Sequence, residues 1–307
     1  MSNIIKIDNL NKSYGSIKAV NNLSFRVKDG ELFSFLGING AGKSTTINMI
    51  CGELKKDSGT ILVCDKEVDS DDKYIKRKIG VVFQESLLDK SLTVYDNLKI
   101  KASLYGITGN DFVKRYNELS KLFDLYEIER QTISQLSGGQ KRRVDIARAM
   151  IHNPEILILD EPTAVLTPQE IQELIQIIRN LTKEGKSVII ITHKLKEIKA
   201  AADHCTIIRR GKYIDTVKVS DTTEDELAAM MVGREVNFKV DKKEARPTSN
   251  VLEIKDLLVK DSRKVSVVDG LSLEVKAGEI LGIAGIDGNG QSELVEVLTG
   301  LRKAESG

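Results

Sequence analysis

The sequence predicts an α/β fold with a mostly parallel β-sheet, followed by part of a second copy of the same domain. Two observations lead to this prediction. Short apolar stretches of strand length alternate with segments of helical periodicity, and this alternation favours a parallel sheet. Residues 28–52 then recur as residues 276–300, and the two stretches align without a gap.

The first expected elements lead into a glycine-rich loop. Residues 4–10, 18–27 and 31–37 are short apolar or alternating stretches, which predicts three strands. Residues 44–51 should form the helix after the loop, with an N-terminus open to anions. Residues 78–83 (KIGVVF) are expected to form a further strand.

The next part of the chain is helical and then returns to strands. Residues 93–150 carry a helical pattern, which predicts a side lobe on the sheet. Apolar side chains in residues 168–182 have the spacing of an amphipathic helix. The strands expected here are residues 156–160, residues 187–192 and a hairpin over residues 205–217.

The recurrence indicates a duplicated domain, because the repeated stretch is too long for a solenoid unit. Residues 237–250 are polar and charged with one proline, which is typical of a linker. We therefore predict a first domain over residues 1–236, a linker over 237–250 and a second domain starting at 251. This second domain is expected to be truncated at residue 307.

The composition restricts the classes of partner and the location. The chain has 46 basic and 45 acidic residues, so its charge favours neither a nucleic acid nor a membrane surface as a partner. There is no apolar run long enough for a membrane span or a signal peptide, which predicts a cytoplasmic protein. Cys51, Cys64 and Cys205 are scattered and are expected to be reduced, small apolar side chains.

The loop over residues 37–44 fits the pattern G-x-x-x-x-G-K-[ST] between a strand and a helix, the context of a phosphate-binding loop. Lys43 is expected to reach the β and γ phosphates, and the hydroxyl of Ser44 to ligate Mg²⁺. If this motif is considered without the rest of the sequence, an ordinary glycine-rich turn is the alternative. The predicted nucleotide-binding residues of the loop are Gly37, Asn39, Gly40, Ala41, Gly42, Lys43, Ser44 and Thr45.

An acidic pair follows the expected strand over residues 156–160. Asp160 ends this strand, which places its carboxylate at the carboxyl edge of the sheet beside the phosphates. We expect Asp160 to be a second ligand of Mg²⁺, mostly through water. The pair Asp160–Glu161 does not by itself decide a function.

Three motifs follow one another in this chain: GINGAGKST at residues 37–45, LSGGQ at residues 136–140 and ILILDEPT at residues 156–163, with His193 in ITH further on. In this order they resemble the ATP-binding cassette of ABC transporters. The resemblance extends over about residues 4–236. It implies a P-loop NTPase fold with an antiparallel β lobe and a helical signature lobe, which binds ATP and Mg²⁺ and hydrolyses ATP.

The resemblance also implies roles for single residues. Glu161 would be the general base or would orient the attacking water, and His193 would contact the γ-phosphate. Gln84 would touch Mg²⁺ and the water, and Tyr14 would stack on adenine. The alternative for Gln84 is a solvated loop residue without a role in the site. The alternative for His193 is a surface or core side chain whose hydrogen bonds are satisfied within the protein. The signature residues Ser137, Gly138, Gly139 and Gln140 would bind the γ-phosphate held by a second cassette, in a homodimer or with a paralogue.

Different parts of the chain resemble two different subfamilies of cassettes. Residues 14–52 and 79–98 look like drug-export cassettes. The residues after the acidic strand instead resemble sugar and nucleoside importers, whose ATPase subunit is a tandem of two cassettes. A chimera, natural or artefactual, is the preferred explanation, and divergence within one family is the alternative. Thr167 stands where most cassettes have an aspartate. Gln291 replaces Lys43 in the second copy and cannot supply its charge.

We therefore expect the ATP-hydrolysing subunit of an ABC transporter, peripheral on the inner face of the cell membrane and coupled to separate permease subunits. The alternatives are a soluble cassette ATPase and a truncated ATP-binding protein without turnover. Soluble cassettes of the translation-factor or DNA-maintenance kind carry long basic linkers or coiled-coil insertions, which are lacking here. The sequence does not decide the transported substrate, import or export, or whether a homodimer is active.

Overall fold

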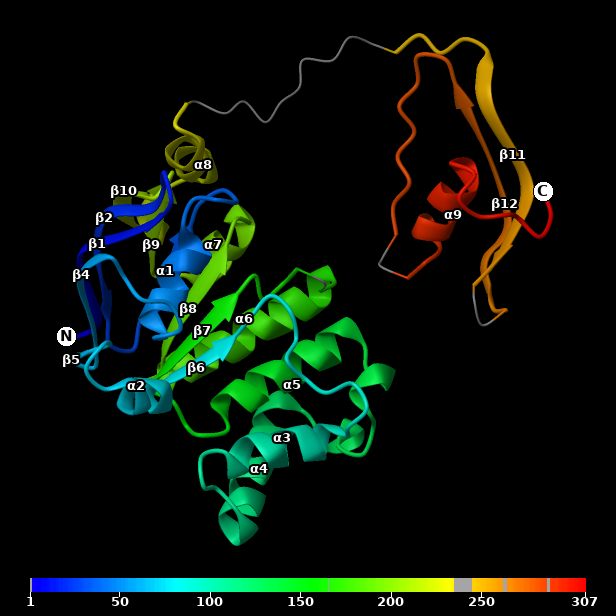
Figure 1. Ribbon diagram of the computed structural model, residues 1–307. Helices are drawn as coiled ribbons and strands as arrows, with labels where there is room; N and C mark the ends of the chain where they lie inside the picture. Colours follow the sequence, from blue (N-terminus) through cyan, green and yellow to red (C-terminus); the bar gives the residue numbers. More distant parts are fainter. Residues whose placement is uncertain (1, 165, 235–244, 262–263, 286–287) are drawn as a thin grey trace. The chain divides into compact units, whose positions relative to one another are not determined.

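The computed structural model describes residues 2–164, 166–234, 245–261, 264–285 and 288–307 (Figure 1). The chain divides into two compact units, Met1–Val236 and Asn237–Gly307. The predicted linker over residues 237–250 falls largely outside the described residues. Among the described residues, no helix has the length and apolar character that a membrane span requires.

A six-stranded sheet forms the centre of the first unit, and its predicted mostly parallel character is confirmed. The central strands β3 and β8 are buried along their whole length, as expected for a parallel sheet covered on both faces. Only β10 runs antiparallel to its neighbour. The strand order is β10 (Lys212–Lys218), β9 (His204–Arg209), β3 (Leu32–Leu36), β8 (Ser187–Thr192), β7 (Ile156–Asp160) and β6 (Ile79–Val82).

A smaller antiparallel sheet packs on one side of this centre (Figure 1). Phe25 lies in this sheet, and its ring stacks on Phe33 of the central sheet at 5.7 Å between centroids. Two of its strands and the helix α2 (Asp72–Lys78) were not predicted from the sequence. The shorter strand has two charged residues, the longer one is apolar only in its second half, and α2 has one buried residue, Ile75. The strand order is β2 (Ile17–Lys28), β1 (Asn3–Tyr14), β4 (Ser58–Val63) and β5 (Lys66–Glu67).

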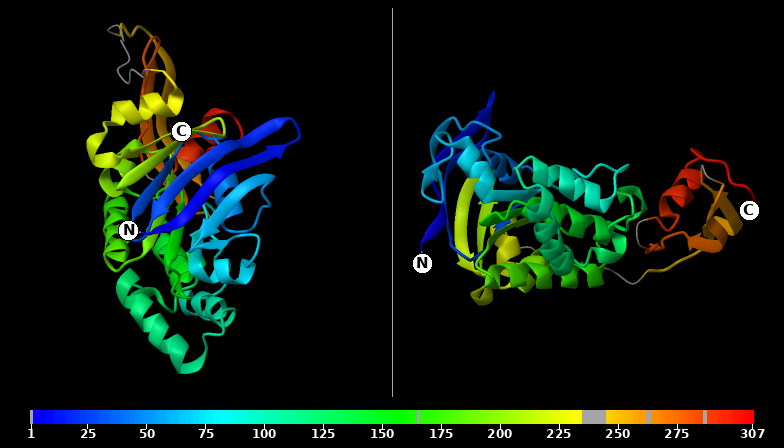
Figure 2. Two further views of the ribbon diagram at one scale, coloured as in Figure 1. Left: turned by 90° about the vertical axis from the view of Figure 1, so that its left-hand side faces the viewer. Right: turned by 90° about the horizontal axis from the view of Figure 1, so that it is seen from below.

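The expected helical stretch over residues 93–150 is divided into three helices, with two 3₁₀ turns between the second and the third. Asp124 adopts a positive φ of 53° and ends α4, so the chain turns before the next helix. Figures 1 and 2 show α3 and α4 away from the antiparallel sheet. The helices of the first unit are α1 (Lys43–Ile50), α2, α3 (Val94–Ser103), α4 (Gly109–Phe123), α5 (Gly138–Met150), α6 (Pro168–Lys183), α7 (Leu195–Ala201) and α8 (Glu224–Val232).

The described residues of the second unit form a β-hairpin and one helix around a small apolar core. The strands β11 (Asn250–Lys260) and β12 (Ser266–Lys276) are antiparallel, and α9 (Gln291–Leu298) contributes Leu294 to the core. The repeat aligns residues 279–285 with the strand expected over residues 31–37, but residues 279–285 form no strand and Ile280 is 80% exposed. In the first unit, the equivalent segment is β3, which lies between β8 and β9. The described residues of the second unit include no strands that could flank residues 279–285 in this way.

Candidate functional site

The glycine-rich loop connects β3 to α1 and folds around the side chain of Lys43. Lys43 is buried, and its Nζ donates to the backbone oxygens of Gly37 at 2.6 Å and Ile38 at 3.2 Å. Gly42 has a φ of 100°, and a Cβ at this position would collide with the backbone oxygen of Ala19. The loop therefore needs glycine at position 42, both for its backbone conformation and for its contact with β2.

A cavity of about 660 Å³ opens beside this loop, which is a size typical of small-molecule sites. The predicted site residues along its wall are Tyr14, Asn39, Gly40, Gly42, Lys43, Ser44, Thr45, Gln84, Glu161 and His193. Ala19, Ala164 and Lys194 also line it, and the sequence analysis did not include them. Lys194 could have been predicted as a site residue, because it directly follows His193 in the sequence.

Three residues predicted for the site lie beside the cavity rather than on its wall. Gly37 accepts the hydrogen bond from Lys43, and the Ala41 side chain is buried in the core. Asp160 ends β7, and its pKa is raised by burial and by the neighbouring charge of Glu161. Burial lowers the pKa of Lys43, while Glu161 and Asp160 oppose this shift. Lys43 and the acidic pair therefore lie within electrostatic reach of each other.

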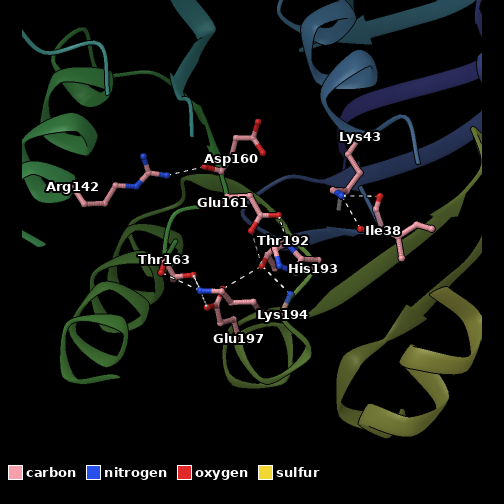
Figure 3. A network of polar contacts seen from close by, with 11 residues as sticks. Ile38, Lys43, Arg142, Asp160, Glu161, Thr163, Thr192, His193, Lys194 and Glu197 are labelled. Carbon is pink, nitrogen blue, oxygen red and sulfur yellow. Dashed lines mark hydrogen bonds and ion pairs between the residues drawn. The ribbon is translucent and has the colours of Figure 1, made fainter. Parts of the chain in front are cut away.

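The acidic pair is joined to the end of the neighbouring strand β8 (Figure 3). Glu161 adopts a φ of 43°, which is unusual for a residue with a side chain, and its N–H donates to Ile191. Its carboxylate lies 2.8 Å from Nδ1 of His193 and accepts a 3.4 Å hydrogen bond from Thr192. The structure thus brings Glu161 and His193 together at one edge of the sheet.

A second buried carboxylate, Glu197, completes this network and was missed by the sequence analysis. Thr163 donates a short hydrogen bond to it, and the hydroxyl of Thr192 lies 3.3 Å away. The ammonium of Lys194 lies 3.2 Å from Glu197 and also donates to the backbone oxygen of Thr163. Glu197 therefore ties the segment after Glu161 to the segment that carries His193.

The signature residues Ser137 to Gln140 form the start of α5 and do not line this cavity. Ser137 caps the helix, because its hydroxyl accepts from the Gln140 N–H while the Gln140 side chain accepts from the Ser137 N–H. Gly139 packs against Glu170 of α6 so closely that a Cβ would collide with the carboxylate. Helix packing thus accounts for Gly139 independently of any ligand.

The donor atoms around the loop fit Mg²⁺ and a nucleotide. Ser44, Gln84 and Asp160 offer only oxygen donors of the kind that Mg²⁺ prefers, and Gln84 and Ser44 share the cavity wall. Among the described residues there is no cluster of three His, Cys, Asp or Glu side chains that would hold a metal alone.

Comparisons with known proteins identify similar chains. A family profile described as ABC transporter matches residues 20–164. The nucleoside import ATP-binding protein NupA of Lactococcus lactis is 46% identical over 99% of this chain and 61% of its own length. The guanosine import ATP-binding protein NupO of Bacillus subtilis is 45% identical over 100% of this chain and 61% of its length.

A solved structure is similar as well. The structure of cbiO1 from Clostridium perfringens, part of the ABC transporter complex cbiONQ, is 31% identical with a TM-score of 0.68. The match covers 72% of this chain and 90% of that chain. The present chain spans 61% of the length of the curated relatives NupA and NupO.

Proposed function

Because this chain belongs to the ATP-binding cassette family of ABC transporters, we propose that it binds and hydrolyses ATP to drive solute import through separate membrane subunits. The observation that carries the proposal is the cavity that joins Lys43 of the phosphate loop to Glu161 and His193. NupA and NupO are described as import ATP-binding proteins for nucleosides and guanosine, which supports a nucleoside as the transported solute.

The nucleotide would lie along the cavity wall from Tyr14 to Glu161. Tyr14 is half exposed at one end and offers a ring for adenine, while Lys43 and the loop N–H groups bind the phosphates. Ser44, Gln84 and Asp160 would hold Mg²⁺, which supplies positive charge to the phosphate oxygens when bound. Lys43 can move from its two carbonyl partners to phosphate oxygens, which carry full negative charge.

Hydrolysis requires water to attack the γ-phosphorus in line with the leaving ADP oxygen. Glu161 is positioned to orient this water and to accept its proton, since its carboxylate reaches the cavity wall. His193 bonds to this carboxylate, and its ring also lines the cavity beside the expected γ-phosphate. The bond between the γ-phosphorus and the bridging oxygen breaks, and ADP and phosphate leave.

A second cassette, from another copy or a paralogue, would complete the site. Ser137 to Gln140 do not line the cavity of their own chain. The cap uses the N–H groups of Ser137 and Gln140, which leaves those of Gly138 and Gly139 for the nucleotide of a partner. The other partners would be permease subunits, which would hold the chain at the inner face of the cell membrane. We propose no nucleic acid partner, because basic and acidic residues nearly balance.

We further propose that residues 251–307 begin a second cassette after a linker over 237–250. The sequence repeat supports this, and so does the position of α9, which starts at Gln291 where α1 starts at Lys43. Gly42 and Gly290 precede the two helices with similar φ values of 100° and 87°. The match to NupA over 99% of the chain supports divergence within one importer family over a chimera.

The proposal is tested by ATP binding and phosphate release with the purified full chain, with Mg²⁺ and with EDTA. Binding of a fluorescent ATP analogue together with Mg²⁺-dependent phosphate release is the expected result. Addition of the cognate permease in vesicles should raise the turnover and move nucleoside inward. A chain that binds no ATP under any of these conditions would contradict the proposal.

A further inference from the structure

Arg142 is a buried cation on α5, close to the nucleotide site but not in contact with the cavity. Only 6% of this residue is exposed. Its guanidinium donates to three backbone oxygens: Nε to Pro162 at 3.0 Å, Nη1 to Phe83 at 2.7 Å, and Nη2 to Asp160 at 2.8 Å. Figure 3 shows Arg142 reaching from its helix toward Asp160.

The three oxygens belong to the segments that carry the candidate catalytic groups. Phe83 directly precedes Gln84, while Asp160 and Pro162 are the two neighbours of Glu161. One side chain therefore binds the carbonyl of the residue before Glu161, the carbonyl of the residue after it, and the carbonyl of the residue before Gln84. These segments follow the neighbouring strands β6 and β7, which end at the same edge of the sheet.

The same side chain links this edge to the signature. Arg142 lies in the second turn of α5, whose first turn contains Gly138 to Gln140. A change in the position of the signature end moves the guanidinium, because a helix of 13 residues moves largely as one body. The carbonyl oxygens bound by Arg142 would have to follow.

Burial of this charge has a cost that must be offset. Desolvation lowers the pKa of Arg142, and the nearby carboxylates Asp145 and Asp160 oppose this shift. Three carbonyl hydrogen bonds to a charged donor compensate the lost hydration. The arrangement requires the planar fork of arginine, because a lysine ammonium is a single point that cannot span three separate oxygens.

We infer that Arg142 is a positioning residue of the ATPase centre, which aligns Glu161, Asp160 and Gln84 and couples their alignment to the signature helix. It does not touch the nucleotide and acts through the backbone. The inference rests on the proposed ATPase function. It predicts that a change at Arg142 impairs turnover and spares nucleotide binding, because the phosphate loop and Lys43 bind other partners.

The test compares Arg142→Lys with Arg143→Lys in the full chain. Arg143 is the next residue of the same helix, and its side chain pairs with Asp124 at 3.2 Å on the surface. R142K should lower kcat by about 10- to 100-fold, as is typical when a residue that orients ligands from behind is changed. KM and the Kd of a fluorescent ATP analogue should stay within about twofold, and R143K should resemble the wild type in all three.

A thermal melt of each variant separates positioning from folding. If R142K does not purify as a folded protein, Arg142→Gln provides a second variant with two donors and no charge, and should show the same loss of kcat. A folded variant with wild-type kcat would overturn the inference, as would a joint loss of kcat and ATP affinity. A wild-type chain that binds or hydrolyses no ATP would instead overturn the proposed function, and the inference with it.

Discussion

Nδ1 of His193 lies 2.8 Å from a carboxylate oxygen of Glu161, although the two residues are 32 positions apart in the chain. The contact follows from the pairing of β7 and β8, which run parallel with Asp160 opposite Ile191. Residues that follow parallel neighbouring strands emerge at the same edge, where ligands of open α/β sheets bind. The pair therefore lies at the edge of the sheet from which the glycine-rich loop also emerges.

Replacement of Lys43 by alanine should weaken ATP binding and lower turnover. The buried ammonium is the cation of the phosphate loop, and removal of one charge-stabilising contact typically costs about 10²–10³ in rate. The measurement is Mg²⁺-dependent binding and phosphate release. Lys76→Ala, at an exposed lysine paired with Asp72, is the matched control and should behave like the wild type. Unchanged affinity and turnover in K43A would exclude a phosphate role for Lys43.

Replacement of Glu161 by glutamine should preserve ATP binding and abolish turnover. The amide keeps the size of the side chain but cannot accept a proton from water. An ATP-bound dimer should then accumulate and be visible by size-exclusion chromatography. Glu155→Gln, at a carboxylate on the surface that pairs with Lys78, serves as the control. Normal hydrolysis by E161Q would transfer the catalytic role to another residue, with His193 and Gln84 as the next candidates.

Replacement of Glu197 by glutamine should destabilise the first unit. The buried carboxylate bonds to two threonine hydroxyls and to the ammonium of Lys194. In the variant, this ammonium would lose its carboxylate partner in the network. We expect the free energy of unfolding to fall by about 1–3 kcal/mol. Urea denaturation measures it, with Glu173→Gln on the exposed face of α6 as the control. Equal stability of the two variants would contradict the role of Glu197.

The protein should lose stability as the pH falls from about 6.5 to about 4. Burial lowers the pKa of His152 from 6.5 to about 4, so the unfolded chain binds a proton in this range and the folded chain does not. The integrated loss is at most about 3.5 kcal/mol, because one pKa unit corresponds to about 1.4 kcal/mol.

A variant isolates the contribution of this histidine. His152→Phe can keep the stacking on the Tyr105 ring, which lies 4.1 Å away between centroids, but has no group to titrate. Its melting temperature should therefore fall less steeply between pH 6.5 and pH 4 than that of the wild type. Parallel pH profiles for the two proteins would show that another group controls this range.

The full chain should bind one nucleotide. Gln291 stands where Lys43 stands in the first unit, and its side chain packs against Gly285 of its own loop. Ile286 and Asp287 of this second loop lie outside the described residues. Titration with a fluorescent ATP analogue gives the stoichiometry, and a chain without residues 237–307 should bind equally well and be more soluble. Two nucleotides per chain would show that the second unit is a working site.

The central strands, the phosphate loop and the acidic pair could be predicted from the sequence, because their signals are local. Buried parallel strands are continuous apolar runs, as in Ile156–Asp160 and Ser187–Thr192, and the loop glycines follow from the backbone that phosphate binding needs. The short strands β4 and β5 were missed because few of their side chains are buried.

Tertiary structure alone decided which charged residues are buried and what they hold. Arg142 and Glu197 are charged residues on helices, and sequence cannot distinguish them from solvated neighbours such as Arg143 and Glu173. Their roles arise from carbonyl and hydroxyl groups on other elements. Tertiary structure also decided that residues 279–285 form no strand, although their sequence is apolar. A strand needs neighbouring strands for its backbone hydrogen bonds, and this stretch has none among the described residues.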